Sequence, residues 1–583
     1  MAARRWVAAP ALAACGLFLA LAALRRGPAL GLGAKYAALT RRSSGGAAIR
    51  LASEFGAVAE GYGAWSHVAE IYAVTTLTLV DEAGVPVDGA VDWAIEGRES
   101  APPAAGAASH VFDRLGYHTV GAGGVNASVL VKYVRRSIYA LSDEARGRFL
   151  DGLKVTYDAD GDEGRRRYGG DFVSMAELVG IHLAGAAARE CDRWHDDAAF
   201  VVKHVALTRL LEASLQAVDA RITVPYWDYA ADASLDDWTS AAVFHKDVLS
   251  PASGNSSDRA VVDGRWAYTR IARARSGAVA NAYGLVRSPW NVNPTPYLTR
   301  YRYVAGLKDG GYALPSRDAF EAAAAAPTLS VLNSLLNGML HGEVHIMLGG
   351  HWGLDAFPAV TSGNDGFLLS SKMLWRQGVL ACPASCAADA GDDCACACPS
   401  SNLDEFLAIR GLAENATTAE ARAEAVLDAA GVLAFSPLFA SGKWLNRGLR
   451  TYATLLDLLC AVGTPGEMFT SAAPYDPAFW PLHGLADRAL LARRSSSSSF
   501  DETWGYAHSL ATVASDTHLV CDWTAVDAGD ATLPECGTAA CEGHRADDLL
   551  PFTVDGATFT NAGYYRFMAP DSAAFPYVYD SVA

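Results

Sequence analysis

The sequence predicts a mainly α-helical protein in which a small β-sandwich domain precedes the helical region. Between residues 66 and 136, short apolar–polar alternations are separated by turn residues, a pattern typical of half-buried strands. At Ser142 the pattern becomes helical, because a Ser N-cap and an acidic first turn are followed by apolar residues at helical spacing. The length of 583 residues suits several domains, since a single core rarely grows beyond about 250–300 residues.

The β-sandwich is expected to hold roughly 70 residues. The segments with strand-like alternation are 70–80, 90–95 and 129–134. Residues 81–84 form a turn signal after the first of them. His67, His110 and His118 are dispersed over this region. They form no constellation, so we interpret them as structural or surface residues.

The first 25 residues have the pattern of a targeting segment. Arg4 and Arg5 precede an uncharged apolar run over residues 6–24, which ends at Arg25. Its length lies between a typical signal-peptide core and the roughly 20 residues that span a bilayer. A cleaved signal peptide and an uncleaved signal anchor both remain open, and a Gly-, Ala- and Arg-rich linker follows over residues 26–65. Either alternative predicts a protein that is secreted, or membrane-anchored and facing the lumen or the extracellular side.

The cysteines agree with that location. Ten of the eleven lie beyond the leader, and an even number suits disulfides in an oxidising compartment. Five of them cluster between Cys382 and Cys398, where a disulfide knot and a soft-metal site are both open and the compartment favours the knot. Sequons for N-glycosylation occur at Asn126, Asn255 and Asn415. The formal net charge of -17 argues against nucleic acid as a partner.

Two histidines four residues apart form the first candidate metal site. His341 and His345 lie in the segment LHGEVHIMLGG, and helical spacing would place both rings on one face. A zinc protease would need a glutamate directly after the first histidine. That position is Gly342, and Glu343 comes one residue later, so the zinc-protease interpretation fails.

Three further histidines lie in apolar, helical contexts. The segment 199–217 has an amphipathic helical pattern that places His204 on its apolar side. His195 precedes this segment, and His182 lies upstream in MAELVGIHLAG. A buried core role and a ligand role are both open for such residues. Three imidazole ligands suit copper and leave positions open for dioxygen.

Four motifs in order resemble those of tyrosinases, catechol oxidases and the related haemocyanins. They are HDDAAFVVKH (195–204), PYWDY (225–229), HGEVHIMLGG (341–350) and DPAFWPLHGLADR (476–488). The resemblance spans about residues 135–235 and 330–490. It implies a four-helix bundle that holds two copper ions and uses dioxygen to oxidise a small phenolic or catecholic substrate.

The resemblance also implies individual roles. The ligands of copper A would be His182, His195 and His204, and those of copper B would be His341, His345 and His483. Phe200 would pack beside the centre. Asp487 and Arg488 would support the last helix rather than take part in the chemistry. No catalytic residue beyond the metal ligands is expected.

The implied division of the chain follows from these motifs. The bundle domain would consist of two segments of the chain. Residues 137–361 would contain the copper A ligands and the first two ligands of copper B, and residues 467–494 would contain the last ligand. Between them lies a cysteine-rich insertion at 362–466, which contains an alanine-rich helix near 417–430 and no histidine. A turn-rich C-terminal extension follows at 495–583.

Several departures from the family pattern narrow the expected activity. Gly342 stands where enzymes that hydroxylate monophenols often have asparagine, and Leu332 and Asn333 stand where an upstream acid is expected. These differences favour oxidation of o-diphenols to o-quinones, with some monophenol hydroxylation still open. Arg193 replaces the cysteine that many relatives join to a copper A ligand, so we expect Cys191 to form a disulfide rather than a thioether.

Other interpretations remain at this point. A haemocyanin-like dioxygen carrier would bind dioxygen without turning over phenols, with the C-terminal extension as a shield over the centre. A copper-free adhesion module is a third alternative, but all six ligand positions are retained. His351, which follows Gly349 and Gly350, is expected to be exposed rather than to line the entrance.

Overall fold

The structure is a computed structural model that describes most of the chain after residue 45. The described residues are 46–53, 65–96, 98–99, 104–189, 192–195, 199–304, 313–353, 366–435, 451–496, 499–504 and 543–582. The predicted leader, most of the linker, Cys191 and three C-terminal cysteines lie outside these ranges. Over the described ranges, the structure contains no helix that is both long enough and apolar enough to cross a membrane.

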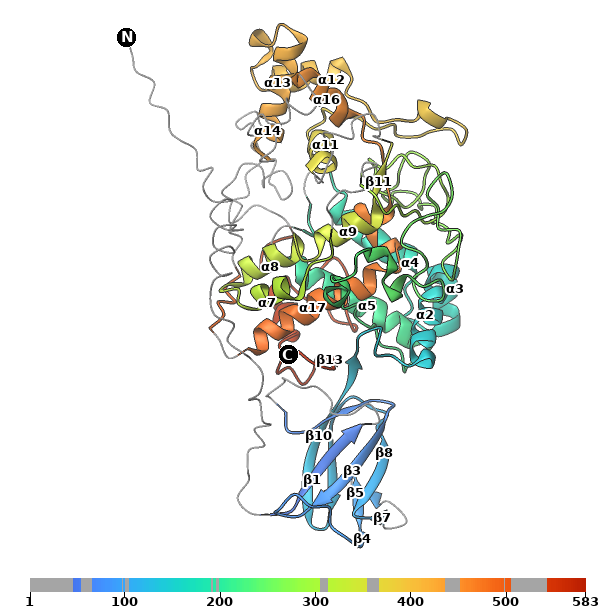
Figure 1. Ribbon diagram of the computed structural model, residues 1–583, viewed down its shortest axis with the longest axis vertical. Helices are drawn as coiled ribbons and strands as arrows, with labels where there is room; N and C mark the ends of the chain where they lie inside the picture. The colour runs from blue at the N-terminus through green and yellow to red at the C-terminus, as the bar shows by residue number, and fades with distance from the viewer. Residues whose placement is uncertain are drawn as a thin grey trace, which may run out of the picture.

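The β-rich region predicted for residues 66–136 is present at one end of the molecule (Figure 1). It also includes residues 48–53, which were expected to belong to the linker but pair with residues 75–80. Its strands are β1 (Ala48–Ser53), β2 (Val68–Glu70), β3 (Val74–Val80), β4 (Ala90–Val91), β5 (Trp93–Ile95), β6 (Arg98–Glu99), β7 (Ala104–Ala105), β8 (Ala107–Val111), β9 (Gly116–Ala122) and β10 (Val125–Arg135). One sheet has the order β1-β3-β8, and another runs β10-β9-β5-β6 with β2 also paired to β10. Leu77, Trp93 and Val120 are fully buried and contribute to its core.

The segment predicted as one strand over residues 70–80 is divided in two. β2 ends at Glu70 and β3 begins at Val74. Tyr72, between them, has a φ of 62°, a left-handed conformation that a continuous strand does not adopt. The chain therefore turns from one sheet to the other at this residue.

The C-terminal end of the chain returns to the β-rich region. β13 (Tyr577–Tyr579) pairs in parallel with the end of β10, so that Tyr133 lies opposite Tyr577. Lys132 on β10 is buried and donates hydrogen bonds to the carbonyl oxygens of Ser572, Ala573 and Phe575. The turn-rich extension thus ends as an additional strand of the sheet, which the sequence did not predict.

The central region is helical (Figure 1), and its helices and the segments beside them contain the candidate ligands. The helices are α2 (Asp143–Asp158), α3 (Gly161–Tyr168), α4 (Met175–Ala186), α5 (Ala199–Val218), α6 (Tyr229–Asp232), α7 (Arg317–Ala324), α8 (Leu329–Asn337), α9 (Gly342–Gly349), α17 (Phe479–Ser495) and α19 (Asn561–Phe567). Ser142 caps α2 as predicted, because its side chain accepts a hydrogen bond from the Ala145 amide. α5 is mostly buried and packs against α2, α8 and α17, so its ligand-bearing face lies inside the helical region.

The insertion forms a separate group of helices at the end opposite the β-rich region (Figure 1). Its elements are α11 (Gly366–Arg376), α12 (Ser400–Ile409), α13 (Ala419–Ala429), α14 (Val432–Phe435) and α16 (Tyr452–Cys460). Cys382–Cys396 and Cys386–Cys394 are disulfides within the segment between α11 and α12, and Cys398–Cys460 is a disulfide between that segment and the end of α16. The disulfide interpretation is therefore confirmed for the cysteine cluster, and α13 is the predicted alanine-rich helix.

Candidate metal centre

The six predicted ligands form two groups of three. Within each group, one nitrogen atom of every ring lies within 4.8 Å of the others. The members are His182, His195 and His204 in the copper A group, and His341, His345 and His483 in the copper B group. The structure thus brings together all six residues named from the sequence.

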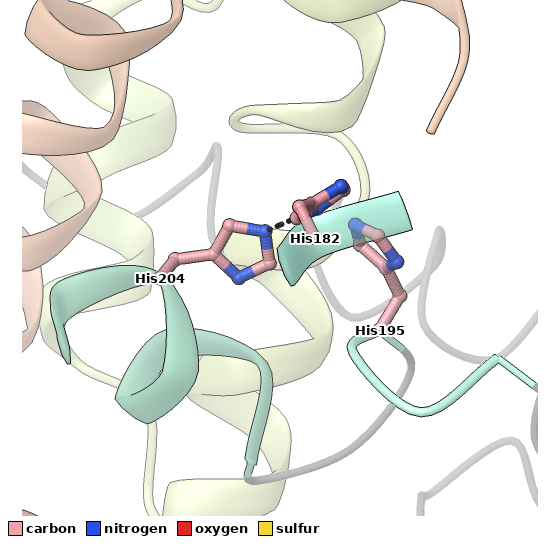
Figure 2. A group of neighbouring side chains, drawn as sticks. All are labelled: His182, His195 and His204. Atoms are coloured by element: carbon pink, nitrogen blue, oxygen red, sulfur yellow. Dashed lines mark hydrogen bonds between the residues drawn. The ribbon is translucent and has the colours of Figure 1, made fainter. Parts of the chain in front are cut away.

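Two helices and a loop supply the copper A group (Figure 2). His182 comes from α4 and His204 from α5, whereas His195 lies on the loop that precedes α5. The Nε2 atoms of His182 and His204 are 3.3 Å apart. The ring of His195 lies 5.4 Å from that of His182 and 5.2 Å from that of His204, measured between centroids. The three rings therefore surround one point.

The Nε2 atoms of the copper B group lie closer together than those of His182 and His204 in the copper A group. The Nε2 atom of His341 lies 2.9 Å from that of His345 and 2.9 Å from that of His483. His345 belongs to α9 and His483 to α17, but His341 occupies the N-cap position just before α9, with φ -143° and ψ -46°. The expectation that His341 and His345 share one continuous helical face was therefore wrong in detail, although their rings do converge.

The two groups are neighbours. The rings of His204 and His483 are stacked at a centroid distance of 4.7 Å with an interplanar angle of 7°. His204 also lies 6.5 Å from His341 by the same measure. Two metal ions held by these groups would lie side by side, as a binuclear centre requires.

Hydrogen bonds to the second ring nitrogen orient most of the ligands. The Nδ1 atoms of five rings lie 2.7–3.0 Å from an oxygen: those of His182 (Ser471 O), His195 (Asp192 Oδ1), His204 (Phe200 O), His345 (Met468 O) and His483 (Phe479 O). A proton on Nδ1 leaves the Nε2 lone pair free for a metal. Among the described residues, the buried Nδ1 atom of His341 has no hydrogen-bond partner.

Burial keeps five of the six imidazoles neutral. It lowers the pKa of His182 and of His345 to about 3. It also lowers the pKa of His204, His341 and His483 well below the usual value. Neutral imidazole is the form that binds metal. Three inward nitrogens per group, without sulfur or carboxylate donors, fit a copper ion in each group.

Aromatic rings form the walls of the centre. Phe200, predicted to pack beside it, lies 4.6 Å from His204 and 5.2 Å from His341 between ring centroids. Phe479 lies 3.8 Å from His483, and Trp194 lies 4.7 Å from His182. Sequence reasoning missed a role for these last two. Their positions, one turn before His483 and directly before His195, were the available signal.

Two of the orienting carbonyls belong to a segment fixed by buried ion pairs. Met468 lies in η6 (Glu467–Phe469), and Ser471 precedes η7 (Ala473–Tyr475). Glu467 pairs with Arg287 at 2.5 Å. At the other end of the segment, Asp476 pairs with Arg300 at 2.6 Å, and all four charged side chains are inaccessible to solvent. These pairs hold the carbonyls that orient His182 and His345, and no sequence signal identified them.

A cavity of about 330 Å³ opens onto the centre. It reaches ligands of both groups and is bounded by Phe479, Met339 and Gly342. Leu368 and Lys372 of the insertion also line it. The cavity is therefore built jointly by the helical region and the insertion.

The structure corrects the expectation for His351. This residue is 2% exposed, and its Nε2 atom lies 2.6 Å from the carbonyl oxygen of Val462. It begins β11 (His351–Trp352), which pairs with β12 (Thr464–Pro465), and burial lowers its pKa to about 4. His351 is neither exposed nor part of the cavity lining, because the strand pairing places it beneath the insertion.

Asp487 has the supporting role that was expected. Its carboxylate accepts hydrogen bonds from the hydroxyl groups of Tyr577 and Tyr579 and from Arg135. Arg488 donates to the carbonyl oxygen of Ser581. Asp487 thus attaches α17 to β13, and Arg488 attaches it to the residues just after this strand.

One family model matches the part of the chain that contains most of the ligands. Residues 173–367 match the family model described as the common central domain of tyrosinase, a range that includes five of the six ligands. No curated protein matches the chain. Similar solved structures include a polyphenol oxidase variant from Thermothelomyces thermophila (11% identity, TM-score 0.36, covering 76% of this chain and 88% of that one). Another is a tyrosinase from Burkholderia thailandensis (12% identity, TM-score 0.30, covering 77% and 73%).

Proposed function

We propose that this chain, whose residues 173–367 match the tyrosinase family model and whose histidines form two groups of three, is a copper oxidoreductase that oxidises o-diphenols to o-quinones with dioxygen. The observation that supports this function is the pair of neighbouring three-histidine groups at the base of a 330 Å³ cavity. When bound, the two copper ions supply the redox chemistry with dioxygen. A cavity of this size suits a small ligand.

The protein residues fix the geometry of the centre and shape the cavity above it. Carbonyl oxygens and one carboxylate hold five of the rings by their Nδ1 atoms, so little reorganisation is needed when a ligand enters. Phe479 lies in the cavity wall beside His483 and offers an apolar surface to an aromatic ring. Met339 adds a second apolar side chain to the lining of the same cavity.

Three features favour o-diphenols over monophenols. Gly342 carries no side chain that could hold a water molecule, and an added Cβ would lie 2.5 Å from the Asn337 carbonyl oxygen. Asn333, at the position of the missing upstream acid, is buried and accepts a hydrogen bond from the Val201 amide. The carboxylate of Asp192 is already bonded to His195 and Lys372. A catechol is more acidic and more easily oxidised than a monophenol, so a catechol suits this site better.

The haemocyanin-like alternative predicts a centre that binds dioxygen but is closed to phenols. The cavity contacts His182, His195, His341 and His345, which favours the enzyme. The test is a steady-state assay with L-DOPA and L-tyrosine on protein of measured copper content. We expect quinone from L-DOPA at a rate well above that from L-tyrosine. Dioxygen binding without quinone from either substrate would instead support the carrier.

We also propose that the protein works in a secretory, luminal or extracellular compartment. Three disulfides are favoured by oxidising conditions, and the sequon residues Asn126, Asn255 and Asn415 are exposed. The targeting segment itself lies outside the described residues. Expression in a eukaryotic host followed by endoglycosidase digestion tests this: a mass decrease supports entry into the secretory pathway, and an unchanged mass contradicts it.

A further inference from the structure

His195 differs from the other ligands in how it is held. It lies on a loop rather than in or directly beside a helix. Its side chain is 26% exposed, whereas His182 and His204 are 1% and 3% exposed as residues. A ring on a loop has fewer packing contacts to fix its orientation, so its hydrogen-bond partner matters more.

That partner is a buried carboxylate. Oδ1 of Asp192 lies 2.9 Å from Nδ1 of His195, and the same oxygen accepts hydrogen bonds from the backbone amides of Trp194 and His195. Asp192 is only 2% exposed. A single oxygen atom therefore fixes both the ring and the backbone of the loop that carries it.

The second carboxylate oxygen is held by two cations from the insertion. Oδ2 of Asp192 lies 3.2 Å from Nζ of Lys372 and 3.5 Å from a guanidinium nitrogen of Arg376. These two residues are one helical turn apart on α11. Lys372 also lies 5.1 Å from the ring of Trp290. A buried carboxylate without such partners would be strongly unfavourable.

We propose that Asp192 is a positioning residue for the copper A ligand His195, with the insertion as its anchor. A carboxylate behind a metal-bound imidazole fixes the tautomer and raises the basicity of the ligand. Lys372 and Arg376 hold that carboxylate in place and balance its charge. The insertion, although it contributes no ligand, is by this account part of the copper A site. The inference concerns copper binding and does not depend on the substrate.

The test is the Asp192→Ala variant of the full chain. Copper per chain is measured by mass spectrometry after dialysis against increasing chelator concentrations. We expect one of the two ions to be released at about 10–100-fold lower chelator concentration than in the parent protein, the typical effect of removing such a partner. The half-loaded protein should give the electron paramagnetic resonance signal of a single Cu(II), which a coupled pair does not give.

Two graded variants and a control sharpen the test. Asp192→Glu keeps the charge and should recover part of the affinity, and Lys372→Met should weaken the same ion less than Asp192→Ala does. Asp404→Asn is the matched control, because Asp404 pairs with Arg422 in the same insertion but its side chain is 60% exposed. Its chelator curve should equal that of the parent.

Two results would overturn the proposal. One is an Asp192→Ala protein with the parent's chelator curve and no Cu(II) signal. The other is simultaneous loss of both ions with a lowered melting temperature of the copper-free protein, which would assign Asp192 to folding instead. Because neither measurement uses a phenol, failure here is distinct from failure of the proposed diphenol oxidation.

Discussion

The Nε2 atoms of His341 and His483 lie 2.9 Å apart although 142 positions separate the two residues in the sequence. The insertion with its three disulfides lies between them in the chain. Despite the insertion, α9 and α17 lie close enough for their ligands to meet, and the copper B group is complete.

His483→Ala is expected to remove the copper B ion selectively. The variant loses a ligand from α17, while the copper A group keeps all three imidazoles and their partners. We expect about one copper ion per chain and a fall in kcat/KM with L-DOPA of more than about 100-fold, since loss of a ligand exceeds the effect of losing a supporting partner. His245→Ala, at a side chain 60% exposed, is the control. Two copper ions in His483→Ala would contradict the assignment.

Gly342→Asn is expected to destabilise the protein without conferring efficient monophenol hydroxylation. The new Cβ would lie 2.5 Å from the Asn337 carbonyl oxygen, so the backbone beside His341 must shift, at a cost of about 1–3 kcal/mol. Urea unfolding measures this cost, and an L-tyrosine assay measures the activity.

Gly147→Ala is the matched control for this substitution. Gly147 lies in α2 with no atom within 4 Å of its added Cβ, so alanine should be neutral or stabilising by up to about 1 kcal/mol. Efficient tyrosine hydroxylation by a stable Gly342→Asn protein would refute our account of this position.

Glu467→Gln is expected to lower both stability and copper retention. The change leaves Arg287 buried without its charged partner, which typically costs about 3–5 kcal/mol. It also loosens the segment whose carbonyls orient His182 and His345. Urea unfolding and chelator titration are the measurements. Glu144→Gln, which removes a surface pair with an 81% exposed carboxylate, should change stability by less than about 1 kcal/mol.

Asp487→Asn is expected to change the pH dependence of stability. Burial raises the pKa of Asp487 above 3.8, and Arg135 and the tyrosine hydroxyls offset only part of this rise. The folded state therefore binds this proton more tightly than the unfolded state. The stabilising contribution is present in full below pH 3.8 and is lost as the pH rises through the raised pKa. Asparagine does not titrate, so the variant has no such contribution to lose. From pH 3.8 upward, its free energy of unfolding should therefore decrease less, or increase more, than that of the parent protein.

Asp219→Asn provides a control of opposite sign for that experiment. Hydrogen bonds from Arg221 lower the pKa of Asp219 below 3.8, so its contribution is lost as the pH falls. Urea unfolding of the copper-free proteins over a pH series measures both variants. Parallel curves for the parent and Asp487→Asn would rule out the raised pKa.

The ligands could be predicted because each lies in a recognisable local sequence pattern. His341 and His345 are four residues apart, His204 lies on the apolar side of a helix, and His483 is part of an extended motif. The limits of α5 and the N-cap of α2 followed from periodicity and capping for the same reason.

The supporting contacts were not predictable, because they join residues far apart in the sequence. Asp192 meets Lys372 across 180 positions, and Arg287 meets Glu467 across 180. Nothing near these residues in the chain indicates their partners. The expectation for His351 failed for the same reason, since its burial depends on pairing with residues 464 and 465.

The segment 543–582 contacts both the loop that carries His195 and the sheet of the β-rich region. The His544 ring is hydrogen-bonded to the backbone carbonyl of Asp192 at 2.6 Å, and β13 completes the sheet beside β10. The loop that carries His195 is thus held from two distant parts of the sequence, by Lys372 and Arg376 of the insertion through Asp192, and by His544. A protein cut before residue 543 would keep all six imidazoles but would lose one of the two contacts that hold the backbone around Asp192, so its defect would lie in the geometry of copper A rather than in the number of ligands.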